Sequence, residues 1–160
     1  MIEFAKKIGE IAIKNHLTIS SAESCTGGLL SSLLTDVSGS SEYIKINFVT
    51  YANEAKSKFV GVKKETLDNF GAVSEQTSRE MAQGLLKYSD VGISTTGIAG
   101  PTGGSIEKPV GLMYVSVAGE NFCETKKIIL PSDIERVEMK KQFTKEALKF
   151  AFETLEKQYT

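Results

Sequence analysis

Three short stretches of this sequence combine reactive side chains with glycines, and each is predicted to follow a strand. The first, residues 22–28, reads AESCTGG and places Ser24, Cys25 and Thr26 before two glycines. N–H groups at the start of a helix are unpaired and favour negative charge. A hydroxyl at such a turn could attack a carbonyl carbon while these N–H groups stabilise the oxyanion. The alternative is an ordinary strand–helix turn capped by Ser and Thr.

Ser24 and Cys25 are neighbouring candidates for the nucleophile, and chemistry alone does not separate them. A cysteine reacts as the thiolate, and a helix N-terminus can lower its pKa. A free cysteine also packs well as a small buried hydrophobic residue. Both interpretations of Cys25 therefore stay open.

The second stretch, residues 49–56, reads VTYANEAK and crosses a predicted turn from a strand into a helix. Tyr51 and Lys56 lie five residues apart, so both could reach one pocket. Either side chain can accept a proton when its pKa falls, which burial can cause for lysine and a nearby positive charge for both. The alternative is that Lys56 is one of the many solvated lysines of the surface.

The third stretch, residues 95–104, reads TTGIAGPTGG and cannot form regular structure because of its Gly and Pro content. Loops of this kind can surround an anion with backbone N–H groups. The stretch matches neither the Walker A motif nor the GxGxxG fingerprint, so it predicts neither ATP nor a dinucleotide as ligand. A flexible surface loop is the alternative.

Alternating helices and strands must position these stretches. The hydrophobic pattern predicts helices at 2–15, 26–34, 53–60, 75–88 and 134–155, and strands at 17–22, 44–51, 90–95, 110–118 and 122–130. This order predicts an α/β protein, a three-layer α/β/α sandwich with a mixed, mostly parallel sheet. Ligands of such sheets bind outside the carboxyl ends of parallel strands, so we expect the three stretches to converge there. His16 is expected at a helix C-terminus, away from catalysis.

The length, net charge and residue composition of the chain argue against several classes of function. The chain has 160 residues and a formal net charge of -1, which predicts one domain over residues 1–160 and argues against nucleic-acid binding. No apolar run reaches the ~18 residues of a membrane span, and the N-terminus lacks a signal peptide, so we expect a cytoplasmic protein without a membrane partner. One His and two Cys without metal-ligand spacing predict no metal and no cofactor.

Six stretches together resemble the CinA C-terminal domain family, whose stand-alone members are nicotinamide-nucleotide amidohydrolases of the PncC type. The stretches run in family order over roughly residues 3–155, and their joint occurrence is a specific signal. They are residues 22–28, 35–41, 49–56, 71–75, 96–101 and 108–111.

The resemblance implies an activity and a set of site residues. The activity is hydrolysis of the carboxamide of nicotinamide mononucleotide to nicotinic acid mononucleotide and ammonia, with no metal. Ser24 would be the nucleophile, activated by Tyr51 and Lys56. Substrate and oxyanion would be held by Thr26, Gly27, Gly28, Gly97 and Gly100. A small-molecule nucleotide is thus the expected partner, and the chain is expected to form a homo-oligomer.

The sequence differs from the family pattern in two places. Residues 132–134 read SDI where the family often has Gly-Asp-Arg, and the nearest arginine is Arg136. Residues 46–48 read INF where relatives commonly have a glycine. Many relatives also carry an N-terminal domain that resembles a molybdopterin-binding domain, which we expect this chain to lack. The alternative function is a non-catalytic domain that binds and senses pyridine nucleotides, which would need the glycine loops but no nucleophile.

Overall fold

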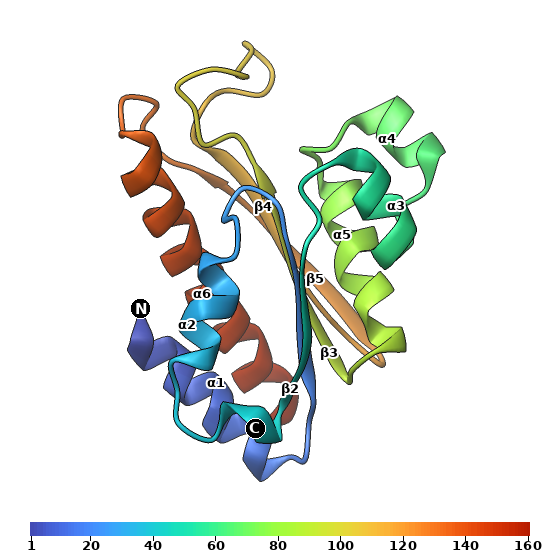
Figure 1. The fold of residues 1–160 in the computed structure, drawn as a ribbon, viewed down its shortest axis with the longest axis vertical. Coiled ribbons are helices and arrows are strands. Elements are labelled where there is room, and N and C mark those ends of the chain that lie inside the picture. Colours follow the sequence, from blue (N-terminus) through green and yellow to red (C-terminus); the bar gives the residue numbers. More distant parts are fainter.

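The computed structural model describes all 160 residues and consists of one sheet between two layers of helices (Figure 1). The strands are β1 (Ile19–Glu23), β2 (Ile44–Val49), β3 (Val91–Gly97), β4 (Leu112–Gly119) and β5 (Phe122–Ile129). The α-helices are α1 (Ile2–Lys14), α2 (Leu29–Thr35), α3 (Asn53–Val60), α4 (Lys64–Phe70), α5 (Glu75–Gly84) and α6 (Arg136–Tyr159). Two short 3₁₀ helices are η1 (Ser40–Glu42) and η2 (Leu85–Lys87). None of the helices combines the length and the apolar character that crossing a membrane requires.

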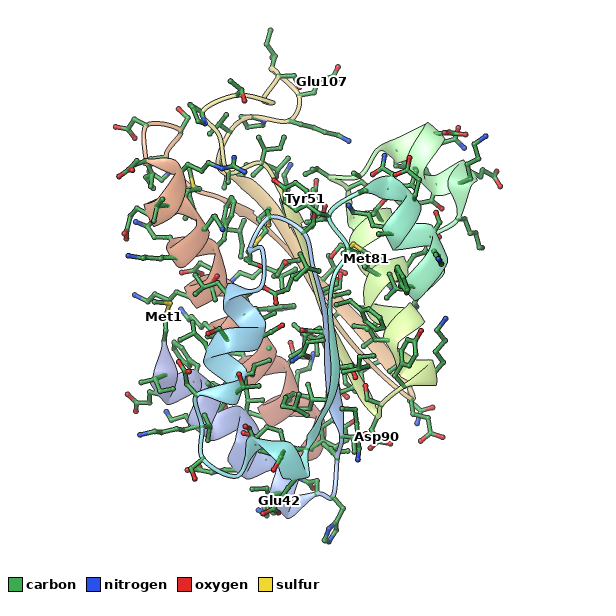
Figure 2. All side chains as sticks on the ribbon, in the orientation of Figure 1. Met1, Glu42, Tyr51, Met81, Asp90 and Glu107 are labelled. Carbon is green, nitrogen blue, oxygen red and sulfur yellow. The ribbon has the colours of Figure 1, made fainter.

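The sheet is mixed, as the sequence predicts. Its strand order is β2-β1-β3-β4-β5, with β1 parallel to both neighbours and β4 antiparallel to both of its own. Four strands therefore run in one direction and only β4 is reversed. The carboxyl ends of β1, β2 and β3 meet at one end of the molecule. Figure 2 shows Tyr51 and Glu107 at that end, and Glu42 and Asp90 at the opposite end.

Helices cover both faces of the sheet, which confirms the three-layer sandwich. Helices α1, α2 and α6 lie on one face, and α3, α4 and α5 lie on the other (Figure 1). Strands β1 and β3 are central, and their side chains are buried except for the partly exposed Gly97. The larger core, between the sheet and α1, α2 and α6, includes Ile8, Ile19, Ile93, Val115, Phe143 and Leu148. The smaller core under α5 consists of Ala22, Val60, Val62, Met81 and Leu85.

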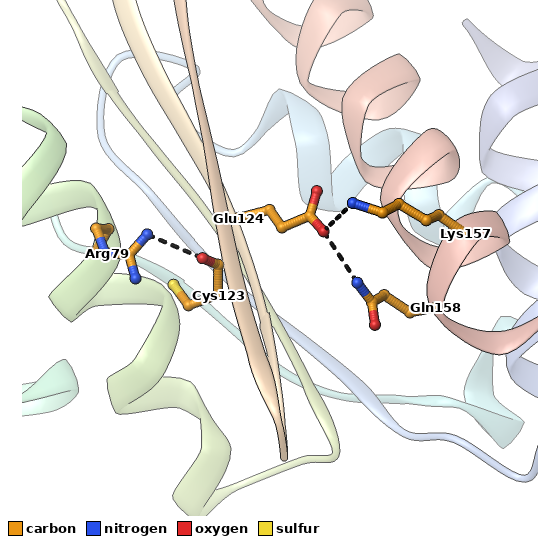
Figure 3. A network of polar contacts seen from close by, with 5 residues as sticks. All are labelled: Arg79, Cys123, Glu124, Lys157 and Gln158. Carbon is orange, nitrogen blue, oxygen red and sulfur yellow. Dashed lines mark hydrogen bonds and ion pairs between the residues drawn. The ribbon is translucent and has the colours of Figure 1, made fainter.

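Strand β5, at the edge of the sheet, is fixed from both layers by two consecutive residues. The guanidinium of Arg79 on α5 donates to the backbone carbonyl of Cys123 at 2.9 Å. The carboxylate of Glu124 accepts from Lys157 at 2.8 Å and from Gln158 at 2.9 Å, both on α6 (Figure 3). The Cys123 carbonyl is thus bound from the α5 side and the Glu124 side chain from the α6 side, so this edge is attached to both helix layers at adjacent residues (Figure 3).

The observed helices differ from the prediction in several places. Helix α2 begins at Leu29 and not at Thr26, because Gly27 and Gly28 adopt positive φ angles of 59° and 102° and form a turn. Helix α6 extends to Tyr159. Helix α4 was not predicted; only Thr66 is buried within it, so its sequence carries no apolar stripe. His16 follows the end of α1 with a φ of 55°, at the helix C-terminus as expected.

Candidate active site

A cavity of about 260 Å³ opens at the carboxyl ends of β1, β2 and β3. The three stretches predicted to converge all contribute to its wall. The lining residues are Ser24, Cys25, Tyr51, Asn53, Lys56, Ala72, Val73, Thr96, Gly97, Ile98, Ala99, Gly100, Thr102, Gly103 and Arg136. Of the predicted site residues, the structure thus brings together Ser24, Tyr51, Lys56, Gly97 and Gly100.

Ser24 and Lys56 face each other at the base of the cavity. Ser24 is the first residue after β1, and its N–H donates to the carbonyl of Thr95 on β3 at 3.0 Å. Lys56 Nζ lies 3.4 Å from Ser24 Oγ and donates to the carbonyls of Thr50 and Tyr51 at 3.0 and 3.1 Å. Lys56 is only 1% exposed and belongs to no ion pair. The lysine is therefore held by neutral oxygens, beside a hydroxyl.

Burial acts in opposite ways on the two ionisable neighbours of Ser24. Removal from water disfavours the charged amine and lowers the pKa of Lys56, although the Glu54 carboxylate works against this shift. The same loss of hydration raises the pKa of the Cys25 thiol to about 12. A neutral amine is a proton acceptor, whereas a thiol with that pKa is almost never a thiolate at neutral pH. The geometry and the charges thus favour Ser24 over Cys25 as nucleophile.

The Tyr51 hydroxyl does not lie beside Lys56 and Ser24, where a residue that activates Ser24 is expected. Its side chain is 60% exposed at the mouth of the cavity, and its hydroxyl accepts from Arg136 Nη2 at 3.1 Å. The backbone carbonyl of Tyr51, and not its hydroxyl, meets Lys56. Arg136 Nη1 also donates to the Gly100 carbonyl at 2.6 Å. Arg136, the first residue of α6, therefore connects both sides of the mouth and is its cationic group.

The turn after Ser24 does not present the free helix N-terminus that the sequence suggested. Glu23 is fully buried, and its carboxylate accepts from the N–H groups of Gly28, Leu30 and Ser31 at 3.2, 2.9 and 3.0 Å. It also accepts from the hydroxyls of Thr26, at 2.6 Å, and Ser31. These N–H groups are consequently not available to an anion from solution, which corrects the expectation for Gly28.

Thr26, Gly27 and Gly28 all lie outside the cavity lining. The Thr26 hydroxyl contacts Glu23 and Thr95, and the Gly27 N–H donates to the Ser24 carbonyl. The N–H groups of Cys25 and Thr26, the two residues that follow Ser24, donate to no carbonyl oxygen of the chain. Sequence reasoning missed Glu23; the available signal was an acidic residue just before a helix start.

The opposite wall of the cavity is formed by the end of β3 and the first part of the loop that leads to β4, residues 96–103. Glycine is required at two of its lining positions: a Cβ on Gly97 would lie 2.6 Å from the Leu112 oxygen, and one on Gly100 would lie 2.4 Å from Val110. Gly100 also has a φ of 78°. The Lys108 ammonium donates to the Phe70 carbonyl at 2.5 Å and fastens the loop to the end of α4. The glycines thus leave backbone open to a ligand along part of this wall.

Other lining residues were not named as site residues from the sequence. They are Asn53, Ala72, Val73, Thr96, Ile98, Ala99, Thr102 and Gly103. Most of them fall inside or beside the quoted stretches, but no spacing rule points to them individually. No group of three or more His, Cys, Asp or Glu side chains is placed to hold a metal ion.

Comparison with known proteins places this geometry in a family. The model of the CinA C-terminal domain matches residues 1–155. A CinA-like protein of Desulforapulum autotrophicum is 53% identical over 124 residues, which are 76% of this chain and 29% of that protein. The chain spans about a third of the length of the curated relatives it matches.

Solved structures agree over nearly the whole chain. The crystal structure of the competence/damage inducible protein CihA from Agrobacterium tumefaciens is 40% identical with a TM-score of 0.90, covering 97% of this chain and 94% of that one. A CinA superfamily protein from Klebsiella pneumoniae is 28% identical with a TM-score of 0.88, covering 96% of each chain. The match therefore includes the sheet, the helices and the strand ends that form the cavity, and this chain belongs to the CinA C-terminal domain family.

Proposed function

We propose that the chain is an amidohydrolase that converts nicotinamide mononucleotide to nicotinic acid mononucleotide and ammonia through an acyl-enzyme on Ser24. The observation that carries this proposal is the buried Lys56 amine, which has no carboxylate partner and lies 3.4 Å from Ser24 Oγ. Burying a lysine without a carboxylate destabilises a fold. A domain that only binds a nucleotide gains nothing from that cost, whereas a serine nucleophile needs a proton acceptor beside it.

In the first half of the reaction, Ser24 Oγ attacks the carboxamide carbon while neutral Lys56 takes the hydroxyl proton. The C–N bond then breaks, and the Lys56 ammonium returns the proton to the departing nitrogen, so ammonia leaves and an ester on Ser24 remains. In this scheme the oxyanion is stabilised by the N–H groups of Cys25 and Thr26, which follow Ser24 in the turn and donate to no carbonyl oxygen of the chain.

In the second half, water attacks the ester carbonyl and Lys56 accepts the proton of that water. The bond from the acyl carbon to Ser24 Oγ breaks, Lys56 reprotonates the serine, and the carboxylic acid product is released. Lys56 thus works directly on Ser24 in both halves. Tyr51, whose hydroxyl contacts Arg136, serves as a wall of the cavity mouth in this scheme.

The nucleotide part of the substrate suits the rest of the cavity. Arg136 supplies a positive charge at the mouth, and a guanidinium can hold a phosphate with two parallel hydrogen bonds. The wall from Gly97 to Gly103 brings backbone close to the ligand because its glycines carry no Cβ. We therefore expect the mononucleotide to bind more tightly than nicotinamide, which lacks the phosphate.

The test is incubation of the purified chain with nicotinamide mononucleotide, with ammonia measured by a coupled glutamate dehydrogenase assay and the acid product by mass spectrometry. We expect equal amounts of both products, undiminished by a chelator. Nicotinamide alone is the matched substrate control. Binding of the mononucleotide in calorimetry without any ammonia would favour the sensing domain, and equal affinity for nicotinamide would contradict the phosphate contact.

A further inference from the structure

We propose that Glu23 is a positioning residue of this reaction: its buried carboxylate holds the turn that carries Ser24 at the distance from Lys56 that catalysis needs. The inference rests on the proposed function and extends it to a residue that does not line the cavity. It is carried by the set of contacts that converge on one side chain.

Five donors and no cation surround the Glu23 carboxylate. One oxygen accepts from Thr26 Oγ1, the Gly28 N–H and the Leu30 N–H, and the other accepts from the N–H and the hydroxyl of Ser31. Glu23 takes part in no ion pair and is fully buried. The carboxylate therefore replaces, as acceptor, the carbonyl oxygens that the first turn of α2 lacks.

Glu23 joins the two halves of the site. Its backbone carbonyl accepts from the Thr50 N–H at 2.9 Å, and the Thr50 carbonyl in turn accepts from Lys56. Its side chain fixes the segment that begins at Ser24. Glu23 thus contacts the turn that carries Ser24 through its side chain, and the turn before Lys56 through its backbone carbonyl.

The network continues away from the cavity on both sides of Glu23. The Thr26 hydroxyl lies 2.8 Å from the hydroxyl of Thr95, whose carbonyl accepts the Ser24 N–H. On the other side, Ser31 Oγ lies 3.0 Å from Ser21 Oγ, which donates to the Asn47 side chain at 2.9 Å. The carboxylate is the centre of a chain of polar contacts that runs from β3 to β2.

The backbone of the turn is closed by two hydrogen bonds, from the Gly27 N–H to the Ser24 carbonyl and from the Leu29 N–H to the Thr26 carbonyl. Gly27 and Gly28 lie at positive φ and have no side chains, so they add no side-chain contact that would hold the turn in one of the many conformations open to glycine. The separation of 3.4 Å between Ser24 Oγ and Lys56 Nζ is already long for a hydrogen bond. A displacement of about 1 Å at a reacting group can lower a rate on the order of 10²-fold. A small shift of this turn would therefore weaken catalysis without changing the cavity's other walls.

Two variants test the inference. Glu23→Gln keeps the size of the side chain but turns an NH₂ group toward donors, which disrupts the turn. Thr26→Val removes one donor to Glu23 and keeps the shape of the residue. This variant still tests the positioning role of Glu23 if Glu23→Gln does not fold. Thr144→Val is the matched control, because Thr144 is equally buried but its hydroxyl donates to the Lys140 carbonyl within α6.

Each folded variant is measured in two ways: kcat and KM for nicotinamide mononucleotide, and the rate at which a fluorophosphonate labels Ser24. We expect Glu23→Gln to lower kcat on the order of 10²-fold, with KM unchanged and the labelling rate lowered in parallel. Thr26→Val should show the same pattern to a smaller extent, and Thr144→Val should change neither quantity.

The outcomes separate this inference from the proposed function. If the wild type is labelled but releases no ammonia, the proposed substrate is wrong, and the labelling rates of the variants still test Glu23. Unchanged kcat and labelling per folded molecule in Thr26→Val and in any folded Glu23→Gln protein would overturn the inference. So would a fall in Thr144→Val as large as in Thr26→Val, or a wild type that is not labelled at Ser24.

Discussion

The cavity has two walls of different construction. On one wall, which we call the side-chain wall and which includes Ser24 and Lys56, the chemistry depends on buried side chains. Lys56 is held there by two carbonyls, and Glu23, behind the wall, is held by five donors. The opposite wall, which we call the backbone wall, is formed by residues 96–103 and includes three glycines, Gly97, Gly100 and Gly103, which leave the backbone open to a ligand. Residues 101–107 of this loop are exposed. The first wall fixes reacting groups, whereas the second offers close approach to a ligand.

Because the two walls differ in this way, substitutions in them should reduce activity in two different ways. Damage to the side-chain wall should lower the rate of the chemical step, because it removes groups that act in the transition state. Damage to the backbone wall and to Arg136 should weaken substrate binding instead, because those groups hold parts of the substrate that do not react. In the kinetics of variants, a fall in kcat should therefore mark damage to the side-chain wall, and a rise in KM damage to the backbone wall.

Replacing the nucleophile should have the largest effect. Ser24→Ala should lower kcat by a factor on the order of 10⁴–10⁶, while the affinity for nicotinamide mononucleotide in calorimetry stays close to that of the wild type. Cys25→Ala is the neighbouring control and should retain most activity, since burial keeps its thiol protonated. A dead Cys25→Ala together with an active Ser24→Ala would move the nucleophile by one residue.

Removing the base should have the next largest effect and should change the pH dependence. The ammonium form of Lys56 cannot accept a proton, so activity is lost as pH falls through the Lys56 pKa, which burial lowers. We expect log kcat of the wild type to rise with a slope of about one on the acid side. Lys56→Met should lower kcat on the order of 10²–10⁴-fold and abolish this slope. If log kcat of the variant still fell with a slope of about one at low pH, the titrating group would be a residue other than Lys56.

Much of this side-chain wall could be predicted from the sequence, but not its contacts. The types and spacing of Ser24, Tyr51 and Lys56 placed them at strand ends that meet, because parallel strands share their carboxyl edge. Nothing local to Lys56 shows that its side chain is buried, since that depends on how α3 packs against the rest of the fold. The contact of Tyr51 with Arg136 joins residues 85 positions apart and has no local signal either.

The elements of the fold could be predicted where the apolar residues recur periodically, and they could not where this period is missing. The strands and the amphipathic helices α1 and α5 follow apolar spacing, and Ser74, a residue type that favours helix starts, caps α5 by accepting from the Thr77 N–H. Helix α4 buries too little to leave a pattern. The role of Glu23 was hidden because a carboxylate is normally a surface group, and only the folded chain gathers five donors around it.

Changing the cation at the mouth should give a moderate effect on binding. Arg136→Met should raise KM for nicotinamide mononucleotide by roughly 10- to 100-fold, since a hydrogen bond to a charged group contributes about 1.5–3 kcal/mol, with kcat much less affected. Turnover of nicotinamide riboside, which lacks the phosphate, should be insensitive to the same change. If KM for both substrates rose equally, Arg136 would be supporting the wall and not contacting the phosphate.

The smallest effect is expected in the backbone wall, where two glycines form a matched pair. Gly100 and Gly103 both have positive φ, at 78° and 89°, so alanine at either costs about 1–2 kcal/mol of backbone strain. Only at Gly100 would the new Cβ meet a close neighbour, Val110 at 2.4 Å, against 3.8 Å to Ile98 at Gly103. Gly100→Ala should therefore raise KM more than Gly103→Ala, with kcat nearly constant in both. Equal effects would show that steric fit at Gly100 does not shape the site.

The central claim is a covalent intermediate on the side-chain wall, and it can be observed directly. Wild-type protein mixed with excess nicotinamide mononucleotide is quenched in acid within the first turnovers, digested and analysed by mass spectrometry. We predict that the peptide containing Ser24 carries the substrate's acyl group, with ammonia lost, and that fragmentation places it on Ser24. Turnover without any adduct would instead favour direct attack by a water beside Lys56, and an adduct on Cys25 would contradict the assignment of the nucleophile.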